Sequence, residues 1–298
     1  YQRCQEYLLE PVVLNMSDTL FRMAGERQDE RMQAVAIATQ LDYYYFQGTN
    51  EDSVIHYTNK VKEFAKATHQ PKYYYFAWAN RLITYYLKTS RTNIALYEVQ
   101  NMLKEAQEED DKTGLSRCYN IMSQIYTIKR FDSMAFEWRL KEIELTEKYK
   151  LENYNISQTY AQIANYYINQ KKQKEALAAV EKAIATANSS TQQISAKLEF
   201  VNYYSKFGDF QAAEKLLKEC QAAFEQDKRL ESIKKRLYNI ECLYYQQTKQ
   251  YQKALEAAKM QEKEERRLSE SILSSIHYRT QGEIYQKMGN MNLAVKYL

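Results

Sequence analysis

Residues that could perform catalysis or bind a metal are scarce and scattered in this sequence. The three histidines stand at His56, His69 and His277, and none has a second histidine or a cysteine at helical spacing. Glycine-rich phosphate loops and the Gly-x-Ser-x-Gly turn of hydrolases are both absent. We therefore expect a protein that is not an enzyme and holds neither a metal nor a cofactor.

The four cysteines are spread along the chain at Cys4, Cys118, Cys220 and Cys242. They form no Cys-x-x-Cys pair, which argues against a zinc site or a redox dithiol. We expect Cys118, Cys220 and Cys242 to be small residues of the core. A disulfide between Cys220 and Cys242 is the alternative.

Charge is abundant but balanced. The chain has 42 basic and 38 acidic residues, interleaved along the sequence, with a formal net charge of +4. This pattern does not indicate a nucleic-acid partner. Acidic stretches at 107–111 and 262–267 lie among lysines and arginines at helix ends, where a solvated helix face is the expected structure.

No stretch is apolar enough to cross a membrane. Mean hydropathy is -0.71, and nowhere do 18 apolar residues follow one another. Any attachment to a membrane would therefore depend on a segment outside this chain.

The elements that position these side chains are helices. Only 6 of 298 residues are glycine and 2 are proline, which leaves little material for turns or strands. The stretch 158–188 has apolar residues at Tyr160, Ile163, Ala164 and Tyr167, a polar break at 171–172, and then a second stripe through Ala176. This spacing predicts two helices joined by a short turn.

The residue types in this stretch resemble the tetratricopeptide repeat, in which an aromatic residue, a small residue and a tyrosine precede an alanine of the second helix. A small residue recurs at that last position at Ser53, Ala95, Ala135, Ala176, Ala213, Ala254 and Ala294. The spacings are 42, 40, 41, 37, 41 and 40 residues. Such regularity indicates a repeat array with helices about a turn longer than in the standard repeat of about 34 residues.

The resemblance implies an all-α fold, a right-handed superhelical solenoid of about seven antiparallel helix pairs with a period of about 40 residues. We expect residues 1–27 to form N-terminal capping helices and residues 28–298 to form the array. The last pair stops inside its second helix at Leu298, so we expect the natural protein to continue.

Turn residues and tyrosines support the hairpins. Glycine follows the first helix at Gly48, Gly208 and Gly289, where a left-handed cap would close it. The 28 tyrosines include the runs 43–45 and 73–75. Because consecutive helical residues point about 100° apart, at least one ring of each run must face away from the core of its own repeat. Those rings either satisfy packing alone or line a partner-binding surface.

In tetratricopeptide arrays the first helices line the concave face. The resemblance then nominates groove residues at two places in each first helix: Asn80, Asn120, Gln124, Asn165, Asn202, Asn239 and Glu283, with Asp42 and Thr84 in the less regular early units. Asparagine both donates and accepts hydrogen bonds, so a row of asparagines could pair with an extended peptide backbone. The alternative is that asparagine is tolerated on a solvated surface.

We therefore expect a module that binds a protein or peptide ligand without catalysis. Long repeats rich in tyrosine are similar to the tetratricopeptide sensor regions of bacterial histidine kinases and transcriptional regulators, which implies a periplasmic or extracytoplasmic location and a possible homodimer. One alternative is a cytoplasmic regulator similar to peptide-pheromone receptors. Another is an assembly scaffold.

Overall fold

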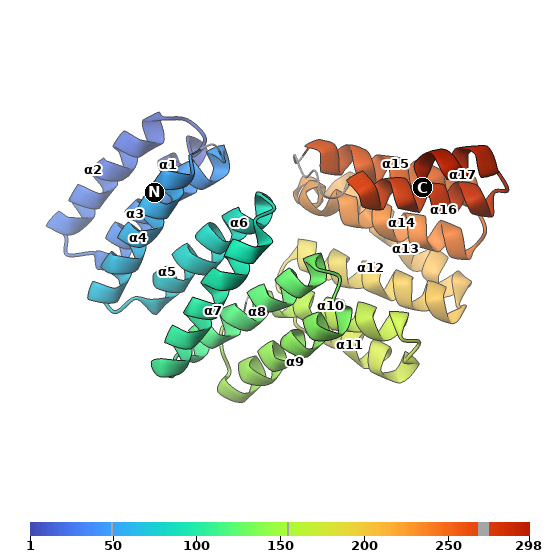
Figure 1. The fold of residues 1–298 in the computed structure, drawn as a ribbon, viewed down its shortest axis with the longest axis horizontal. Helices are drawn as coiled ribbons and strands as arrows, with labels where there is room; N and C mark the ends of the chain where they lie inside the picture. The colour runs from blue at the N-terminus through green and yellow to red at the C-terminus, as the bar shows by residue number, and fades with distance from the viewer. Residues whose placement is uncertain (49, 154, 268–273) are drawn as a thin grey trace. The chain divides into compact units, whose positions relative to one another are not determined.

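A computed structural model describes residues 1–48, 50–153, 155–267 and 274–298 of the chain, which form two compact units, residues 1–151 and 152–298. Unit 1 contains α1 (Gln2–Glu6), α2 (Val12–Glu26), α3 (Glu30–Gln47), α4 (Glu51–Ala67), α5 (Pro71–Tyr75), the π-helix η1 (Phe76–Ile83), α6 (Thr84–Lys88), α7 (Thr92–Glu108), α8 (Lys112–Ile128) and α9 (Asp132–Tyr149) (Figure 1).

Unit 2 contains α10 (Ile156–Asn169), α11 (Gln173–Ala185), α12 (Ser190–Phe207), α13 (Phe210–Gln226), the 3-10 helix η2 (Lys228–Ile233), α14 (Lys234–Gln247), α15 (Tyr251–Arg267), α16 (Ser274–Lys287) and α17 (Met291–Tyr297). Within each unit, consecutive helices pack as antiparallel hairpins (Figure 1). The predicted all-α array of tetratricopeptide-like hairpins is confirmed. None of the described helices is long and apolar enough to cross a lipid bilayer.

The hairpins share one buried position, which is the fourth residue of each second helix. In α7, α9, α11, α13, α15 and α17 this residue is the predicted alanine, and each of these alanines is at most 1% exposed. In α4 the fourth residue is Val54, which is fully buried, whereas Ser53 is only half-buried. The first repeat is therefore in register one residue later than the sequence analysis placed it.

The one irregular spacing has a local cause. Only 37 residues separate Ala176 from Ala213, and the helix that begins this interval, α11, has 13 residues where most second helices have 17. A helix shorter by four residues loses about one turn. The buried alanine is therefore kept in both hairpins, although the first of them has a shorter second helix.

The turns after the first helices are closed by the backbone. In six turns a tyrosine stands nine residues before the buried alanine. Its carbonyl accepts a hydrogen bond of 2.8–3.0 Å from the backbone N–H five residues later. These tyrosines are Tyr86, Tyr126, Tyr167, Tyr204, Tyr245 and Tyr285. This bond belongs to the Schellman motif, which needs a left-handed residue at the turn. Gly48, Gly208 and Gly289 have positive φ angles, as predicted.

Other turns of this kind lack glycine. Ser90, Arg130, Lys171 and Lys249 take left-handed φ angles of 57–64° instead. Side chains with a Cβ atom disfavour this conformation, so the packing of the hairpins must hold these turns in place.

Bulky aromatic residues fill the core of unit 1. Tyr75 of α5 is 1% exposed, and its ring lies so close to Gly114 of α8 that a Cβ on that glycine would come within 2.3 Å of Cζ. The four cysteines are also buried and carry free thiols. Cys118, Cys220 and Cys242 thus occupy the core positions expected for them.

Candidate ligand-binding surface

A polar cavity of about 540 Å³ lies in unit 2 where three successive first helices begin. We call it the unit-2 cavity. Its lining residues come from α10, α12, η2, α14 and α15: Asn155, Ser157, Gln158, Ala161, Thr191, Gln192, Ser195, Ala196, Ser232, Ile233, Lys235, Arg236, Asn239 and Gln261. Amides, hydroxyls and two basic side chains dominate this set, and it contains no carboxylate.

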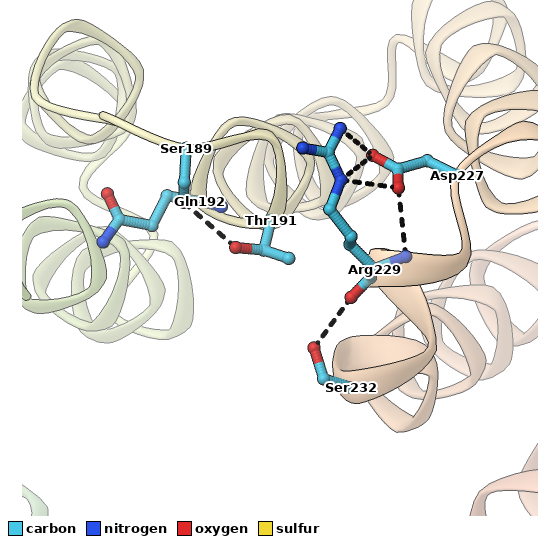
Figure 2. Close-up of polar contacts among 6 residues, drawn as sticks. All are labelled: Ser189, Thr191, Gln192, Asp227, Arg229 and Ser232. Atoms are coloured by element: carbon cyan, nitrogen blue, oxygen red, sulfur yellow. Dashed lines mark hydrogen bonds and ion pairs between the residues drawn. The ribbon is translucent and has the colours of Figure 1, made fainter. Parts of the chain in front are cut away.

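Local caps fix the rim of the unit-2 cavity (Figure 2). Ser189 caps α12 by accepting a hydrogen bond from the Gln192 N–H at 3.3 Å, and its hydroxyl lies 3.0 Å from that of Thr191. On the other side, the Ser232 hydroxyl donates to the Arg229 carbonyl at 3.0 Å. Thr191 and Gln192 therefore lie in the first turn of α12, and Ser232 lies in η2, at places that these hydrogen bonds fix.

Beside this rim, Asp227 and Arg229 form a forked ion pair, with Arg229 Nη2 2.8 Å from Asp227 Oδ2 (Figure 2). Arg229 and its backbone N–H hold the pKa of Asp227 down to about 2. Hydrogen bonding to the ionised form is the physical cause. Asp227 therefore keeps its negative charge for Arg229 at physiological pH.

A buried charge pair supports the wall of the unit-2 cavity. Arg236 Nη2 donates to Glu199 Oε1 at 2.6 Å, and the Glu199 side chain is only 6% exposed. Asn202 is also buried and donates to the second oxygen of Glu199 at 3.4 Å. Arg236 Nε is buried without a hydrogen-bond partner.

The predicted groove residues of unit 2 take different places. Asn239 lines the cavity, and Asn202 lies buried against Glu199. Asn165 is exposed on α10, where it accepts from Asn169 at 3.3 Å. Glu283 pairs with Arg279 along α16 at 2.9 Å. Only Asn239 is therefore both open and part of the cavity.

In unit 1 the predicted residues Gln124 and Asn120 form a chain on α8. Gln124 Nε2 donates to Asn120 Oδ1 at 2.7 Å, and Asn120 Nδ2 donates to both carboxylate oxygens of Glu142 at 3.2 and 3.1 Å. Glu142 is 1% exposed. Asn120 therefore helps to compensate a buried charge, while Gln124 remains exposed.

A second cavity, of about 330 Å³, lies in unit 1 between α3, the α5–η1 segment and α8. We call it the unit-1 cavity. Its lining residues are Tyr1, Arg31, Met32, Val35, Ala38, Thr39, Asp42, Lys72, Tyr73, Phe76 and Arg117. Asn80, predicted for the groove, touches this wall because Arg117 Nη1 donates to its Oδ1 at 3.5 Å.

Asp42, the carboxylate of this cavity, has a partner already. Arg81 Nε lies 2.5 Å from Asp42 Oδ1, and both side chains are largely buried. The Arg81 guanidinium also lies over the rings of Phe76 at 4.3 Å and Tyr45 at 4.8 Å. Burial raises the pKa of Asp42, and the ion pair with Arg81 opposes this effect.

Each tyrosine run has a deeply buried member and a less buried one. Tyr45, Tyr74 and Tyr75 are at most 9% exposed, whereas Tyr43, Tyr44 and Tyr73 are partly exposed. Tyr73 lines the unit-1 cavity. Tyr44 and Tyr73 still pack against the core cluster of unit 1, so burial within each run is graded. That a ring of each run serves in recognition remains a prediction.

Sequence reasoning missed the basic residues of both cavities. Arg31, Lys72 and Arg117 in unit 1 and Lys235 and Arg236 in unit 2 looked like ordinary surface charges. Arg117, Lys235 and Arg236 lie three or four residues before the nominated Asn120 and Asn239, which was the available signal. Arg31 and Lys72 had no such signal. Among the described residues, no group of three histidine, cysteine or acidic side chains is arranged to hold a metal ion.

The acidic stretches also have structural roles. Asp111, at the end of the stretch 107–111, caps α8 by accepting from the Gly114 N–H at 2.9 Å. Glu262 accepts from Gln281 at 2.6 Å. The side chains of 265–267, which end the second stretch, lie outside the described residues.

No protein-family model matches the sequence, and no curated protein matches it. Solved structures do share the fold. A tetratricopeptide repeat protein from Parabacteroides merdae is 14% identical over 95% of this chain and 90% of its own, with a TM-score of 0.50. A Rap protein complexed with Competence and Sporulation Factor is 14% identical over 95% of this chain and 94% of its own, with a TM-score of 0.54.

Proposed function

We propose that this chain is a non-catalytic module that binds a protein or peptide, with the unit-2 cavity as its principal recognition site. The observation that carries the proposal is the lining of that cavity, where amides and hydroxyls from three successive first helices meet. Amide side chains donate and accept at once, as a peptide backbone requires. A volume of about 540 Å³ lies within the range of known ligand sites.

The finer role that we propose is ligand sensing for a larger bacterial signalling protein. A sensor of this kind would stand outside the cytoplasmic membrane and could act as a homodimer. Helix starts around one cavity suit this role, because a ligand that bridges α10, α12 and α14 would change how three hairpins pack. Differential binding of this kind is what shifts an equilibrium between two states.

The second candidate is a cytoplasmic peptide-responsive regulator. It is favoured by the Rap protein, which shares this fold and was solved with Competence and Sporulation Factor. An assembly scaffold is a third candidate. The genomic reading frame separates the first two, since a signal peptide and a membrane span favour the sensor, whereas an N-terminal helix-turn-helix favours the regulator.

The binding site itself can be tested by selecting peptides from a random display library against the full chain. The affinity of a selected peptide is then measured by calorimetry for the wild type, Asn239→Ala and Gln192→Ala. Each variant should weaken binding by about five- to tenfold, because each loses one or two hydrogen bonds to the ligand. The melting temperature of Asn239→Ala should change little, because Asn239 is exposed. Gln192→Ala should lower it, because Gln192 Oε1 also accepts from the Asn188 N–H at 3.0 Å at the start of α12.

Gln252→Ala is the matched control, because Gln252 is exposed on α15 and does not line the cavity. Its affinity should equal that of the wild type. Asn165→Ala reports whether a ligand extends along α10 beyond the cavity. Wild-type affinity in both Asn239→Ala and Gln192→Ala would exclude the unit-2 cavity as the binding site.

A further inference from the structure

We propose that the unit-1 cavity binds a carboxylate group of a peptide ligand through Arg117 and Arg31. This inference rests on the proposed function. It adds a ligand chemistry for unit 1, which the proposal for the unit-2 cavity leaves without a role. Nothing in the repeat pattern requires basic residues here, so their convergence needs its own explanation.

The charges around the unit-1 cavity are not balanced. Arg31 comes from α3, Lys72 from α5 and Arg117 from α8, so three separate helices each bring a basic side chain to one hollow of about 330 Å³. Asp42 is the carboxylate among the lining residues, and Arg81 already neutralises it at 2.5 Å. Even with Lys72 set aside, Arg31 and Arg117 bring positive charge to the cavity that an anion would offset.

Arg117 is the basic residue that gains most from a ligand. Its side chain is half-buried, and its Nη1 donates to the amide oxygen of Asn80 at the long distance of 3.5 Å. Glu142, whose charge acts on Arg117, already accepts two hydrogen bonds from Asn120. Burial lowers the pKa of Arg117, because a buried guanidinium loses part of its hydration.

Arg31 of α3 supplies the second contact, from a different helix than Arg117 of α8. It is exposed, and no ion pair involves it among the described residues. The Tyr73 hydroxyl beside it raises the pKa of Arg31. Two arginines that line one cavity suit a carboxylate, whose two oxygens can each accept from one guanidinium.

The π-helix explains why this wall differs from those of the other hairpins. Between Phe76 and Ile83 the backbone takes a wider turn, and Thr84 Oγ1 donates to the Ala79 carbonyl five residues earlier at 2.9 Å. Such bulges change the direction of the side chains and recur at functional sites. Here the bulge contains Asn80 and Arg81 and begins at Phe76, which lines the cavity.

The test uses fluorescein-labelled tetraglutamate, blocked at both ends, titrated with the full chain and followed by fluorescence anisotropy. Tetraglutamine with the same label is the neutral probe. We expect tetraglutamate to bind at low salt and tetraglutamine to bind at least about tenfold more weakly. Arg117→Gln should weaken tetraglutamate binding about tenfold, and the exposed Arg31→Gln about threefold.

Lys104→Gln is the charge-matched control, because Lys104 is 77% exposed on α7 and outside the cavity. Its affinity for tetraglutamate should remain that of the wild type. Equal loss in Lys104→Gln and Arg31→Gln would overturn the proposal, since binding would then follow net charge. Equal binding of the two probes, or displacement of tetraglutamate by inorganic phosphate at the same concentration of anionic groups, would also overturn it.

This experiment is independent of the unit-2 cavity. Asn239→Ala leaves the unit-1 cavity intact, so tetraglutamate should bind it as it binds the wild type. If display peptides bind at the unit-2 cavity while tetraglutamate does not bind at all, the proposed function stands and the carboxylate site falls. If tetraglutamate binds while no display peptide depends on Asn239, the carboxylate site stands and the unit-2 cavity is rejected as the recognition site.

Discussion

Removing the hydroxyl of Tyr75 by the substitution Tyr75→Phe should stabilise the protein. The Tyr75 side chain is 1% exposed, and its hydroxyl is buried without a hydrogen-bond partner. The hydroxyl of its neighbour Tyr74, by contrast, is hydrogen-bonded. The Tyr74 hydroxyl donates to Glu105 Oε1 at 2.6 Å.

The magnitudes follow from these two environments. A buried polar group without a partner costs about 1–3 kcal/mol, so Tyr75→Phe should raise the free energy of unfolding by about 1 kcal/mol after a small loss of packing. Tyr74→Phe loses a hydrogen bond to a charged acceptor, a contribution of about 1.5–3 kcal/mol. Because Glu105 stays partly exposed and keeps its ion pair with Lys66, the lower end of that range applies.

Urea unfolding followed by circular dichroism at 222 nm measures both effects. The two variants should move the midpoint in opposite directions while the slope with urea stays constant. Tyr74→Phe serves as the internal control, since it removes the same atom from the next residue. If Tyr75→Phe lowers stability as much as Tyr74→Phe does, the Tyr75 hydroxyl has a partner and the reasoning is wrong.

Three further outcomes are expected. Gly114→Ala should lower the free energy of unfolding by about 1–3 kcal/mol in urea titrations, because the new Cβ would meet the ring of Tyr75. Lys249→Gly should raise the melting temperature, with a gain of about 0.5–1 kcal/mol, since glycine relieves the left-handed strain at φ 60°; an unchanged melting temperature would contradict this. Burial raises the pKa of Cys118 to about 12 and of Cys220 to about 11, so Ellman's reagent at pH 8 should label these thiols only after unfolding.

The repeat was predictable because one contact governs it. An alanine at the fourth position of a second helix lets two helices approach closely, and that requirement leaves a mark at nearly constant spacing. The prediction was wrong by one residue at Ser53, because Val54 fills the same position with a larger side chain. A search for small residues could not find a valine.

The turns were only partly predictable. Gly48, Gly208 and Gly289 announce a left-handed residue, whereas Arg130 and Lys249 adopt the same conformation under tertiary packing. Local propensity does not contain that information, since packing energy from elsewhere holds the strained residue in place.

The recognition surface was the least predictable part. Asn202 and Asn239 fit the same pattern, yet one lies buried against Glu199 and the other is open. Asn202 shares Glu199 with Arg236, which comes from the next first helix, and the spacing within one helix does not reveal such a partner. The π-helix around Asn80 also left no sequence mark, because widening a turn changes hydrogen bonding and not residue type.

The carbonyl that closes each turn has a consequence for how such arrays diverge. A main-chain oxygen is the same whatever side chain its residue carries, so the hydrogen bond that the carbonyl of Tyr86 or Tyr285 accepts places no demand on the tyrosine side chain. Mutation can therefore replace most of the surface of a repeat while the angle between its two helices is inherited unchanged. Chains that differ at about six positions in seven can then still superimpose, as this one does on the Rap protein at 14% identity.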